Sequence, residues 1–377
     1  MTENIKHIVF VNHTRALHGS EQVMLTTIRQ CSAQGWKVTI VLPQNKPDEG
    51  LENALGSEIE ILYLKYTNSG GGLLRTFLVE LYNLPAVYRL SRWIKKNKVD
   101  LVYSNTSVTL PGIEAAYRAK IPHIWHWHEL PSEEFGWSSS SLMILRHWKK
   151  YNHRILFISQ NQKQMWEKSL GCHHIANAEV VYNPIRTICT QRSEHEGSIR
   201  IGYVGGFNER KNLPWLIQTV ERLTYKYNVH LFLYGAKDEK EKAYIQSLVS
   251  DTKVLSVYEY TTNVESAYAN LDIFVLPSWS ETMPLVVLEA MQAGVCVLQT
   301  NHSGMTELMH DNKECLFINP ENPESLYQAL ICCMDDSFRT EIAMRGQQFA
   351  KDWMTKNKYQ QNIISIFNRI LNVRQWK

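Results

Sequence analysis

The amino-acid sequence predicts an α/β protein with two domains, each a parallel β-sheet covered by helices on both faces. Short apolar runs alternate with helical patterns along the whole chain, which is typical of parallel sheets. The alternation forms two sets of similar size, separated by a polar segment over residues 187–198. The length of 377 residues also suits two domains better than a single core.

The first set of predicted strands fills the N-terminal half of the chain. Apolar runs predict strands over residues 5–11, 36–42, 100–104, 121–128 and 154–158. A loop over residues 12–20 follows the first strand, and the next helix is expected to open at Glu21. The pattern ends near Pro184, so the first domain is predicted over residues 1–185.

The second set begins after the polar segment. Its strands are predicted over residues 199–204, 229–235, 271–277, 295–298 and 315–318. A turn at Gly205 and Gly206 follows the first of these strands, and a helix begins after Asn212. The second domain is predicted over residues 186–356, and a last helix, at about 357–377, is expected to pack back on the first domain. Two Rossmann-like halves are therefore expected to face each other across a cleft.

Residues 280–294 combine a strand end, a helix start and two carboxylates. The apolar run before them closes at Pro277, Pro284 suits the first helical turn, and Gly294 suits the position after the last turn. Glu281 then lies in the loop that enters the helix, and Glu289 lies within it, about 7 Å along the axis from Pro284. The free N–H groups at the helix start suit a phosphate. The spacing by itself is equally consistent with an ordinary amphipathic helix that has one exposed Glu at each end and binds no ligand.

Composition excludes several classes of protein. A hydrophobic content of 44% and a charged content of 20% are typical of a globular protein, and a net charge of +3 argues against a nucleic-acid partner. No apolar run is long enough to span a bilayer, and the N-terminus lacks the pattern of a signal peptide. Seven scattered cysteines without a CxxC pair predict reduced thiols. A cytoplasmic protein is the expectation.

Several separated motifs, in the same order, resemble the retaining glycosyltransferases of family four, which have the GT-B fold. In that family a Glu, seven intervening residues and a second Glu mark the donor site, and these are Glu281 and Glu289 here. The other matching segments are residues 18–21, 127–131, 205–212, 276–278 and 303–307. The resemblance therefore extends along nearly the whole chain.

The resemblance implies a role for each residue of a nucleotide-sugar site. Lys211, with Arg210, would neutralise the diphosphate leaving group, where charge accumulates as the glycosidic bond breaks. Glu289 would bind the ribose, and Glu281 would orient the donor sugar without acting as a nucleophile. Many relatives have Arg at the position of Gly206, so either Arg210 substitutes for it from four residues along or one phosphate contact is missing. The remaining donor-binding residues implied are Gly19, Gly205, Tyr260, Thr282, Met283, Pro284 and Leu285.

The histidines near the end of one predicted strand have competing interpretations. His126 and His128 alternate with tryptophans, so both face the same side of a strand. The resemblance implies an active-site role for His128, in contact with the donor sugar or phosphate, while His126 is expected in the core. A zinc site that also uses His123 is the alternative, although the family generally needs no metal. No cofactor is expected.

The function implied is transfer of a sugar from a nucleotide diphosphate sugar to an acceptor hydroxyl, with retention of configuration, in bacterial surface polysaccharide or glycolipid synthesis. The acceptor would be a glycan or a lipid-linked glycan. Two alternatives remain open, a GT-B sugar-nucleotide epimerase or hydrolase and a non-catalytic nucleotide-sugar-binding subunit. A nicotinamide dehydrogenase is disfavoured, because the loop after the first strand contains no GxGxxG.

Two basic segments leave the question of membrane contact open. One covers residues 142–154, and the other carries Arg89, Arg92, Lys95, Lys96 and Lys98. Such segments are either solvated helix faces or surfaces that lie on an anionic membrane, here the inner face of the cell membrane. A peripheral contact with a lipid-linked acceptor is the second of these interpretations.

Overall fold

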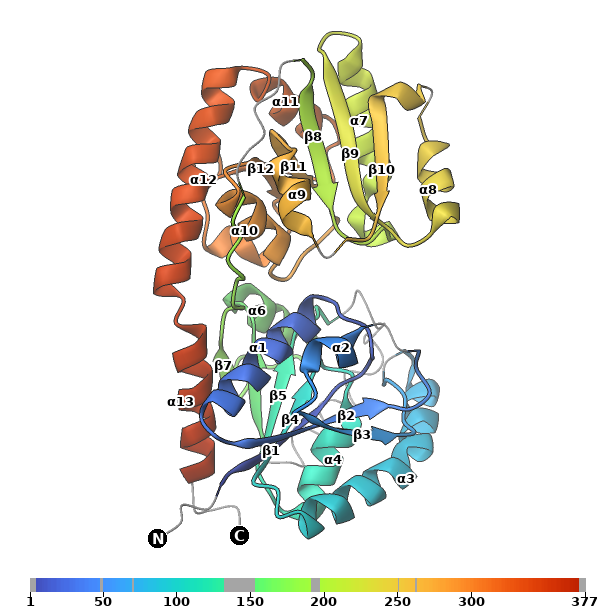
Figure 1. The fold of residues 1–377 in the computed structure, drawn as a ribbon, viewed down its shortest axis with the longest axis vertical. Coiled ribbons are helices and arrows are strands. Elements are labelled where there is room, and N and C mark those ends of the chain that lie inside the picture. The colour runs from blue at the N-terminus through green and yellow to red at the C-terminus, as the bar shows by residue number, and fades with distance from the viewer. Residues whose placement is uncertain are drawn as a thin grey trace. The chain divides into compact units, whose positions relative to one another are not determined.

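The computed structural model describes residues 5–47, 50–69, 71–131, 153–190, 197–249, 251–261 and 263–372. The chain divides into two compact units; in Figure 1 the first runs from blue to green and includes the red last helix, and the second runs from yellow-green to orange-red. The N-terminal unit consists of Met1–Pro184 together with Lys358–Lys377, and the C-terminal unit is Ile185–Asn357. Each unit contains a parallel sheet with helices, so the predicted fold class is confirmed. The basic segment over residues 142–152 and the linker residues 191–196 lie outside the described residues.

The N-terminal unit is built on a seven-stranded parallel sheet with the order β3-β2-β1-β4-β5-β6-β7. The strands are β1 (His7–Val11), β2 (Lys37–Pro43), β3 (Glu60–Leu64), β4 (Leu101–Asn105), β5 (His123–Trp127), β6 (Arg154–Phe157) and β7 (Ala178–Val180). Sequence reasoning missed β3 and β7, the two edge strands. Both are largely unburied, so neither carries the continuous apolar run that marks a central strand.

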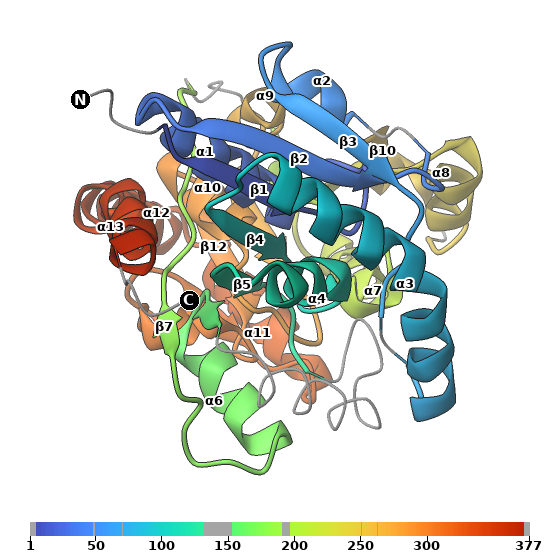
Figure 2. The ribbon, with the colours of Figure 1, turned by 90° about the horizontal axis from the view of Figure 1, so that it is seen from below.

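Alternate side chains of β1 point to opposite faces of the sheet, and each set packs against the helices on its face. Val9 and Val11 pack in one core cluster with Leu90 and Ile94 of α3 (Leu73–Lys96) and with residues of α4 (Leu110–Ala119). Figure 2 shows α3 and α4 side by side on this face. The ring of Phe10 stacks instead on Phe367 of α13 (Tyr359–Asn372) at 6.5 Å. The last helix thus packs on the N-terminal unit.

The other helices of this unit are α1 (Gly19–Ala33), α2 (Leu51–Leu55) and α6 (Gln160–Ser169). The prediction that α1 opens at Glu21 was wrong by two residues, because Gly19 already lies in its first turn and His18 is the N-cap. The hydroxyls of Thr27 and Tyr359 are 2.6 Å apart, which ties α1 to α13.

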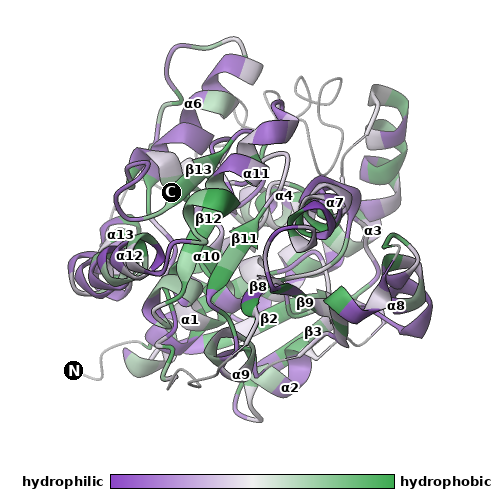
Figure 3. Ribbon diagram, turned by 90° about the horizontal axis from the view of Figure 1, so that it is seen from above, coloured by the Kyte–Doolittle hydropathy of each residue, from purple (hydrophilic) through white to green (hydrophobic). Residues whose placement is uncertain are grey.

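The C-terminal unit is built on a six-stranded parallel sheet with the order β10-β9-β8-β11-β12-β13. The strands are β8 (Ile199–Val204), β9 (Val229–Ala236), β10 (Leu255–Glu259), β11 (Ile273–Leu276), β12 (Cys296–Thr300) and β13 (Leu316–Ile318). Residues of β11 and β12 are all buried, and those of β11 are all apolar (green in Figure 3). The edge strand β10 was not predicted, since its second half is exposed.

The helices of the C-terminal unit follow these strands. They are α7 (Leu213–Thr224), α8 (Glu239–Gln246), α9 (Val264–Ala269), α10 (Leu285–Gln292), α11 (Pro323–Cys332) and α12 (Asp336–Lys356), with short 3-10 helices η1 (Glu209–Lys211), η2 (Thr252–Val254) and η3 (Gly304–Glu307). Loops at the carboxyl ends of β8 and β11 lead into η1 and α10. In parallel sheets this edge is where ligands bind.

Candidate functional site

The loop from β11 to α10 has the local structure that the sequence predicts. Pro284 is the N-cap of α10, Ala293 is its C-cap, and Gly294 follows with a φ of 72°. This left-handed conformation favours glycine and closes the helix. Among the described residues, the backbone N–H groups of Thr282 and Leu285 donate to no protein oxygen. The start of α10 therefore offers unpaired donors and the positive end of the helix dipole.

Glu281 is buried at the centre of a cluster of charges beside the start of α10. Its side chain is only 6% exposed, and its Oε1 accepts a hydrogen bond from Lys211 Nζ at 2.6 Å. Arg210 Nη1 is 3.0 Å from its Oε2, and Ser278 Oγ donates at 2.6 Å. Arg210 also donates to the carbonyl of Ser280 at 2.8 Å. Residues from two loops, 70 positions apart in the chain, are thus held together.

These contacts fix the charge of Glu281. Burial by itself would raise the pKa of the carboxyl, but the attraction of Lys211 and Arg210 and the hydrogen bonds from Lys211 and Ser278 lower it to about 2. The carboxylate is therefore ionised throughout the neutral range. Two cations and one anion leave a net positive charge at the start of α10, which suits an anionic ligand.

The pKa of Glu281 predicts how stability depends on pH. A carboxyl with a lowered pKa stabilises the fold above its unfolded value and loses this contribution as pH falls toward its folded value. For a drop from 4.5 to about 2 the contribution is on the order of 3 kcal/mol. We expect the free energy of unfolding of Glu281→Gln to lie below that of the wild type at pH 7, with the gap closing between pH 4.5 and 2. Urea unfolding at a series of pH values measures it, and a gap independent of pH would contradict the ion-pair account.

Glu289 is buried on α10 and already has partners on both oxygens. Its side chain is 5% exposed, and its Oε1 accepts from Arg186 Nε at 2.7 Å. Its Oε2 accepts from the Tyr268 hydroxyl of α9 at 3.1 Å. This burial excludes an amphipathic helix with exposed glutamates at both ends. Sequence reasoning missed Arg186, which lies 103 residues away, although a buried carboxylate always needs a partner.

Arg186 belongs to the segment with which the C-terminal unit begins. Burial alone would lower the pKa of its guanidinium, but the hydrogen bond and the attraction of Glu289 raise it. The segment is also held by Gln292, which donates to the Arg186 carbonyl at 3.0 Å and accepts from Ile188 N at 3.1 Å. Glu289 therefore links the predicted nucleotide site to the segment that leaves the N-terminal unit.

Glycines shape the turn that precedes Arg210 and Lys211. Gly205 has a φ of 149°, and a Cβ on Gly235 would lie 2.0 Å from the Gly205 carbonyl oxygen. Only glycine at position 235 permits this close approach of the two backbones. A Cβ on Gly206 would meet nothing within 4 Å, so this position has room for a larger side chain. Arg210 lies four positions further along, in η1.

Tyr260 lies directly after β10, at the same edge of the sheet. Its backbone N–H donates to the Ala236 carbonyl at 2.9 Å, and its ring is 55% exposed. The neighbouring rings of Tyr234 and Tyr258 stack at 4.8 Å with an interplanar angle of 10°. An exposed aromatic surface is therefore present where the sequence predicts contact with a base.

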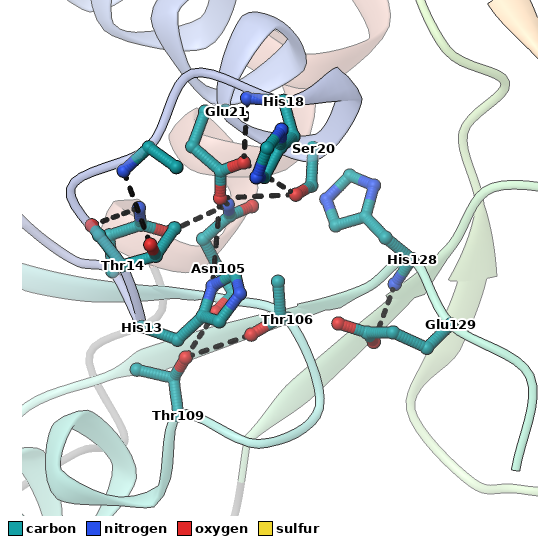
Figure 4. Close-up of polar contacts among 12 residues, drawn as sticks. His13, Thr14, His18, Ser20, Glu21, Asn105, Thr106, Thr109, His128 and Glu129 are labelled. Atoms are coloured by element: carbon teal, nitrogen blue, oxygen red, sulfur yellow. Dashed lines mark hydrogen bonds and ion pairs between the residues drawn. The ribbon is translucent and has the colours of Figure 1, made fainter. Parts of the chain in front are cut away.

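A second polar cluster lies in the N-terminal unit, at the carboxyl ends of β1, β4 and β5 (Figure 4). Glu21 of α1 is fully buried at its centre and accepts from His18 N at 3.3 Å and from Asn105 Nδ2 at 3.3 Å. Ser20 Oγ donates to Glu21 Oε2 at 3.0 Å, and His13 Nδ1 lies 3.6 Å from Glu21 Oε1. This cluster belongs to the N-terminal unit, whereas the one around Glu281 belongs to the C-terminal unit.

His128 reaches this cluster from the end of β5. It is 8% exposed, its backbone N–H donates to Glu129 Oε2 at 3.2 Å, and its Nε2 is buried without a hydrogen-bond partner among the described residues. Burial, and then the neighbouring His126 and His13, hold the pKa of His128 well below its usual range, so the ring is neutral at pH 7. A buried polar atom without a partner is rare and calls for a ligand or water.

The neighbouring histidines do not join His128 in a metal site. His126 lies 4.2 Å from the His128 ring, bonds to the Tyr103 hydroxyl and is fully buried, which confirms its place in the core. His123 points to the other face of the strand and bonds to Ser104 Oγ at 2.9 Å. Within the ranges that the structure describes, no three His, Cys, Asp or Glu side chains form a metal-binding group. Gly19, in the first turn of α1, has open space around it.

Comparisons with known proteins agree with this geometry. The family model "Glycosyltransferase Family 4" matches residues 17–187, and the model "Glycosyl transferases group 1" matches residues 198–336. The chain is 29% identical over 161 residues to the lipopolysaccharide core biosynthesis glycosyltransferase LpsE of Rhizobium meliloti, covering 40% of this chain and 46% of LpsE. It is 24% identical over 211 residues to the O-antigen biosynthesis glycosyltransferase WclY of Escherichia coli, covering 52% and 56%. The matched regions thus span about half the length of these relatives.

A solved structure matches over almost the whole chain. HepE from Anabaena in complex with UDP-glucose has a TM-score of 0.79 at 17% identity, covering 96% of this chain and 99% of HepE. The likeness shows a common GT-B fold. Together, the two family models, which match successive parts of the chain, and the similarity in sequence support a glycosyltransferase of the family 4 type with the GT-B fold.

Proposed function

We propose that this protein is a retaining glycosyltransferase that moves a sugar from a nucleotide diphosphate sugar to an acceptor hydroxyl in bacterial surface polysaccharide or glycolipid synthesis. The observation that carries the proposal is the group that the buried Glu281 forms with the partly exposed Arg210 and Lys211 beside the start of α10. The names of LpsE and WclY support the polysaccharide context, and the UDP-glucose in the HepE structure supports uridine as the first base to test.

The donor would bind with its diphosphate at Lys211, Arg210 and the free N–H groups before α10. Charge on the leaving diphosphate grows as the bond to the sugar breaks, and fixed cations in a buried site stabilise that charge. The diphosphate would then compete with Glu281 for the two cations, so Glu281 becomes free to hydrogen-bond the donor sugar. Glu289 would bind the ribose hydroxyls, while the hydrogen bond from Arg186 Nε holds its carboxylate in place.

Retention without a covalent intermediate requires attack on the face from which the diphosphate leaves. The bond from the anomeric carbon to the phosphate oxygen breaks, the acceptor oxygen bonds to that carbon, and the acceptor proton passes to the leaving phosphate oxygen. His128 is neutral and keeps an unpartnered Nε2, so it suits a hydrogen bond to the donor sugar or the phosphate. The acceptor would be a glycan or a lipid-linked glycan.

The test is a reaction of the full chain with UDP-sugars and lipid-linked glycan acceptors, with NMR of the product to read its anomeric configuration. We expect UDP release that depends on the acceptor and a product with the configuration of the donor. The rate is expected to persist in EDTA, because Arg210 and Lys211 supply the positive charge. Loss of activity in EDTA that a divalent ion restores would contradict this role of the two cations.

Three other outcomes would overturn the proposal of retaining transfer. An epimer or free sugar formed without an acceptor indicates an epimerase or a hydrolase. Tight binding of nucleotide sugars with no consumption across a broad set of acceptors indicates a non-catalytic binding subunit. A product of inverted configuration indicates transfer by direct displacement from the opposite face.

A further inference from the structure

A buried network of hydrogen bonds leads from α1 to the ring that packs on His128. The Tyr103 hydroxyl of β4 bonds to His126 Nδ1, and the two rings meet edge to face at 5.8 Å. The Thr27 hydroxyl of α1 is bonded to Tyr103 and also to Tyr359 of α13, the latter at 2.6 Å. All four of these side chains are buried, so the network is closed to solvent.

A backbone carbonyl fixes the direction of this network. Thr27 Oγ1 lies 3.0 Å from the Val23 carbonyl, which can only accept, so the single hydroxyl hydrogen of Thr27 is used there. The Thr27 oxygen must then accept from both tyrosine hydroxyls. Because Tyr103 gives its hydrogen to Thr27, its own oxygen accepts from His126 Nδ1. The hydrogen bonds therefore place the proton of His126 on Nδ1.

The His126 ring is neutral, so the choice of tautomer is the only one left to it. Burial lowers the pKa of His126 to about 3, which leaves the two neutral forms near pH 7. With the proton on Nδ1, the ring presents a lone pair at Nε2, an atom that is buried without a hydrogen-bond partner among the described residues. The other tautomer would bury an unpaired N–H group at this place. The hydrogen bond at one ring nitrogen thus decides the state of the other.

The state of His126 matters because its ring lies against His128. The two ring centroids are 4.2 Å apart with an interplanar angle of 40°. His128 Nε2 has no hydrogen-bond partner in the described part of the chain, so contact with the neighbouring ring helps to hold its orientation. Moving the His126 proton between its nitrogens changes the direction of the ring dipole, and a buried site screens that change only weakly.

We propose that His126 is a positioning residue, which holds the ring of His128 in its working orientation through the tautomer that Thr27 and Tyr103 select. The kinetic consequence rests on the proposed function, in which His128 contacts the donor. The tautomer itself and its effect on the neighbouring ring can be measured without any substrate.

NMR of the full chain with isotope-labelled histidine tests the tautomer directly. Protonated and unprotonated ring nitrogens resonate far apart, so each ring reports which of its nitrogens carries the proton. Comparison with His126→Gln and His128→Gln assigns the two signals. Near pH 7 we expect a protonated Nδ1 and an unprotonated Nε2 for His126. A protonated Nε2 would overturn the proposal.

Thr27→Val keeps the shape of the side chain and removes the acceptor of the Tyr103 hydrogen. Tyr103 is then expected to donate to His126 Nδ1, which moves the His126 proton to Nε2 and shifts the His128 signals. We expect kcat to fall about tenfold with little change in KM for the donor, an effect of about one hydrogen bond. Thr27→Ser restores the hydroxyl and is expected to restore both the tautomer and the rate.

Tyr359→Phe is the matched control, because it removes a hydroxyl of the same network without changing the direction of the hydrogen bonds. The Thr27 hydrogen stays on the Val23 carbonyl, and Tyr103 still donates to Thr27. The tautomer, the His128 signals and kcat are therefore expected at the wild-type level. Thermal unfolding of both variants shows how much stability each lost hydroxyl costs.

Three results would contradict the positioning role. One is an unchanged His126 tautomer in Thr27→Val, and another is the same change of tautomer in Tyr359→Phe. The third is a changed tautomer in Thr27→Val that leaves the His128 signals or kcat at the wild-type level. If the wild type transfers no sugar, the proposed function fails, while the NMR signals of the two rings still decide whether His126 positions His128.

Discussion

Replacing Glu289 with alanine is expected to weaken binding of the nucleotide-sugar donor about 100-fold. A buried carboxylate that accepts two hydroxyl hydrogen bonds contributes about 1.5 kcal/mol or more for each of them. The substitution also leaves Arg186 and Tyr268 without their partner, so part of the effect comes from disorder of the site. Isothermal titration with UDP and UDP-sugars measures the loss directly, apart from any effect on turnover.

Two further variants separate ribose binding from support of the site. Glu289→Gln keeps the size of the side chain but removes its charge, and it is expected to lose most of the affinity. Glu265→Ala is the control, because Glu265 Oε1 accepts from Cys189 N of the same linker segment and is not part of the proposed donor site. Affinity at the wild-type level in Glu289→Ala would remove this residue from the donor site. An equal loss in Glu265→Ala would show that the effect acts through the linker.

Replacing His128 with alanine is expected to lower kcat about 100-fold and to leave the affinity for the donor nearly unchanged. A group that contacts the reacting centre contributes most in the transition state, so its loss appears in kcat rather than in binding. Its buried Nε2 has no partner among the described residues, so the side chain is ready for such a contact. Steady-state kinetics with saturating acceptor separates the two parameters.

The neutral state of His128 adds an expectation on pH. Because its pKa lies well below the usual range, its protonation should cause no loss of activity between about pH 6 and 8. The control is His310→Ala, whose side chain is 72% exposed and lies in the other unit. If His128→Ala raises KM for the donor and leaves kcat unchanged, His128 is a binding residue. If His128→Ala changes neither kcat nor KM, His128 is not part of the site.

The fold class could be predicted because strands that are buried on both faces of a parallel sheet appear in the sequence as continuous apolar runs. The strand predicted over residues 199–204 is β8 itself, and the turn and helix after it lie where expected. The edge strand β10 was not predicted because Tyr258 and Glu259 face water, so its sequence resembles that of a loop.

In helix α3 the difficulty was an excess of apolar residues. Its residues 74–90 are apolar on both faces, so a pattern that predicts burial could not tell the outer Leu81 from the inner Leu90.

The candidate site was predictable in its residue types but not in its pairings. Glu281 and Glu289 follow from the resemblance to the family's spaced pair of glutamates, and Lys211 follows from the turn after β8. The contact of Arg186 with Glu289 joins positions 103 apart, and no local pattern records it. The unpartnered Nε2 of His128 is likewise visible only in three dimensions, because it depends on what surrounds the end of β5.

The central claim is that the loops after β8 and β11 form a diphosphate site. Titration of the wild-type protein with uridine, UMP, UDP and UDP-glucose tests it most directly, because only the last two carry the diphosphate. The claim predicts that UDP binds at least about tenfold more tightly than UMP, since Lys211, Arg210 and the start of α10 would contact the added phosphate. It also predicts that Lys211→Ala reduces this difference. Equal affinities for UMP and UDP, or a difference that Lys211→Ala leaves unchanged, would contradict it.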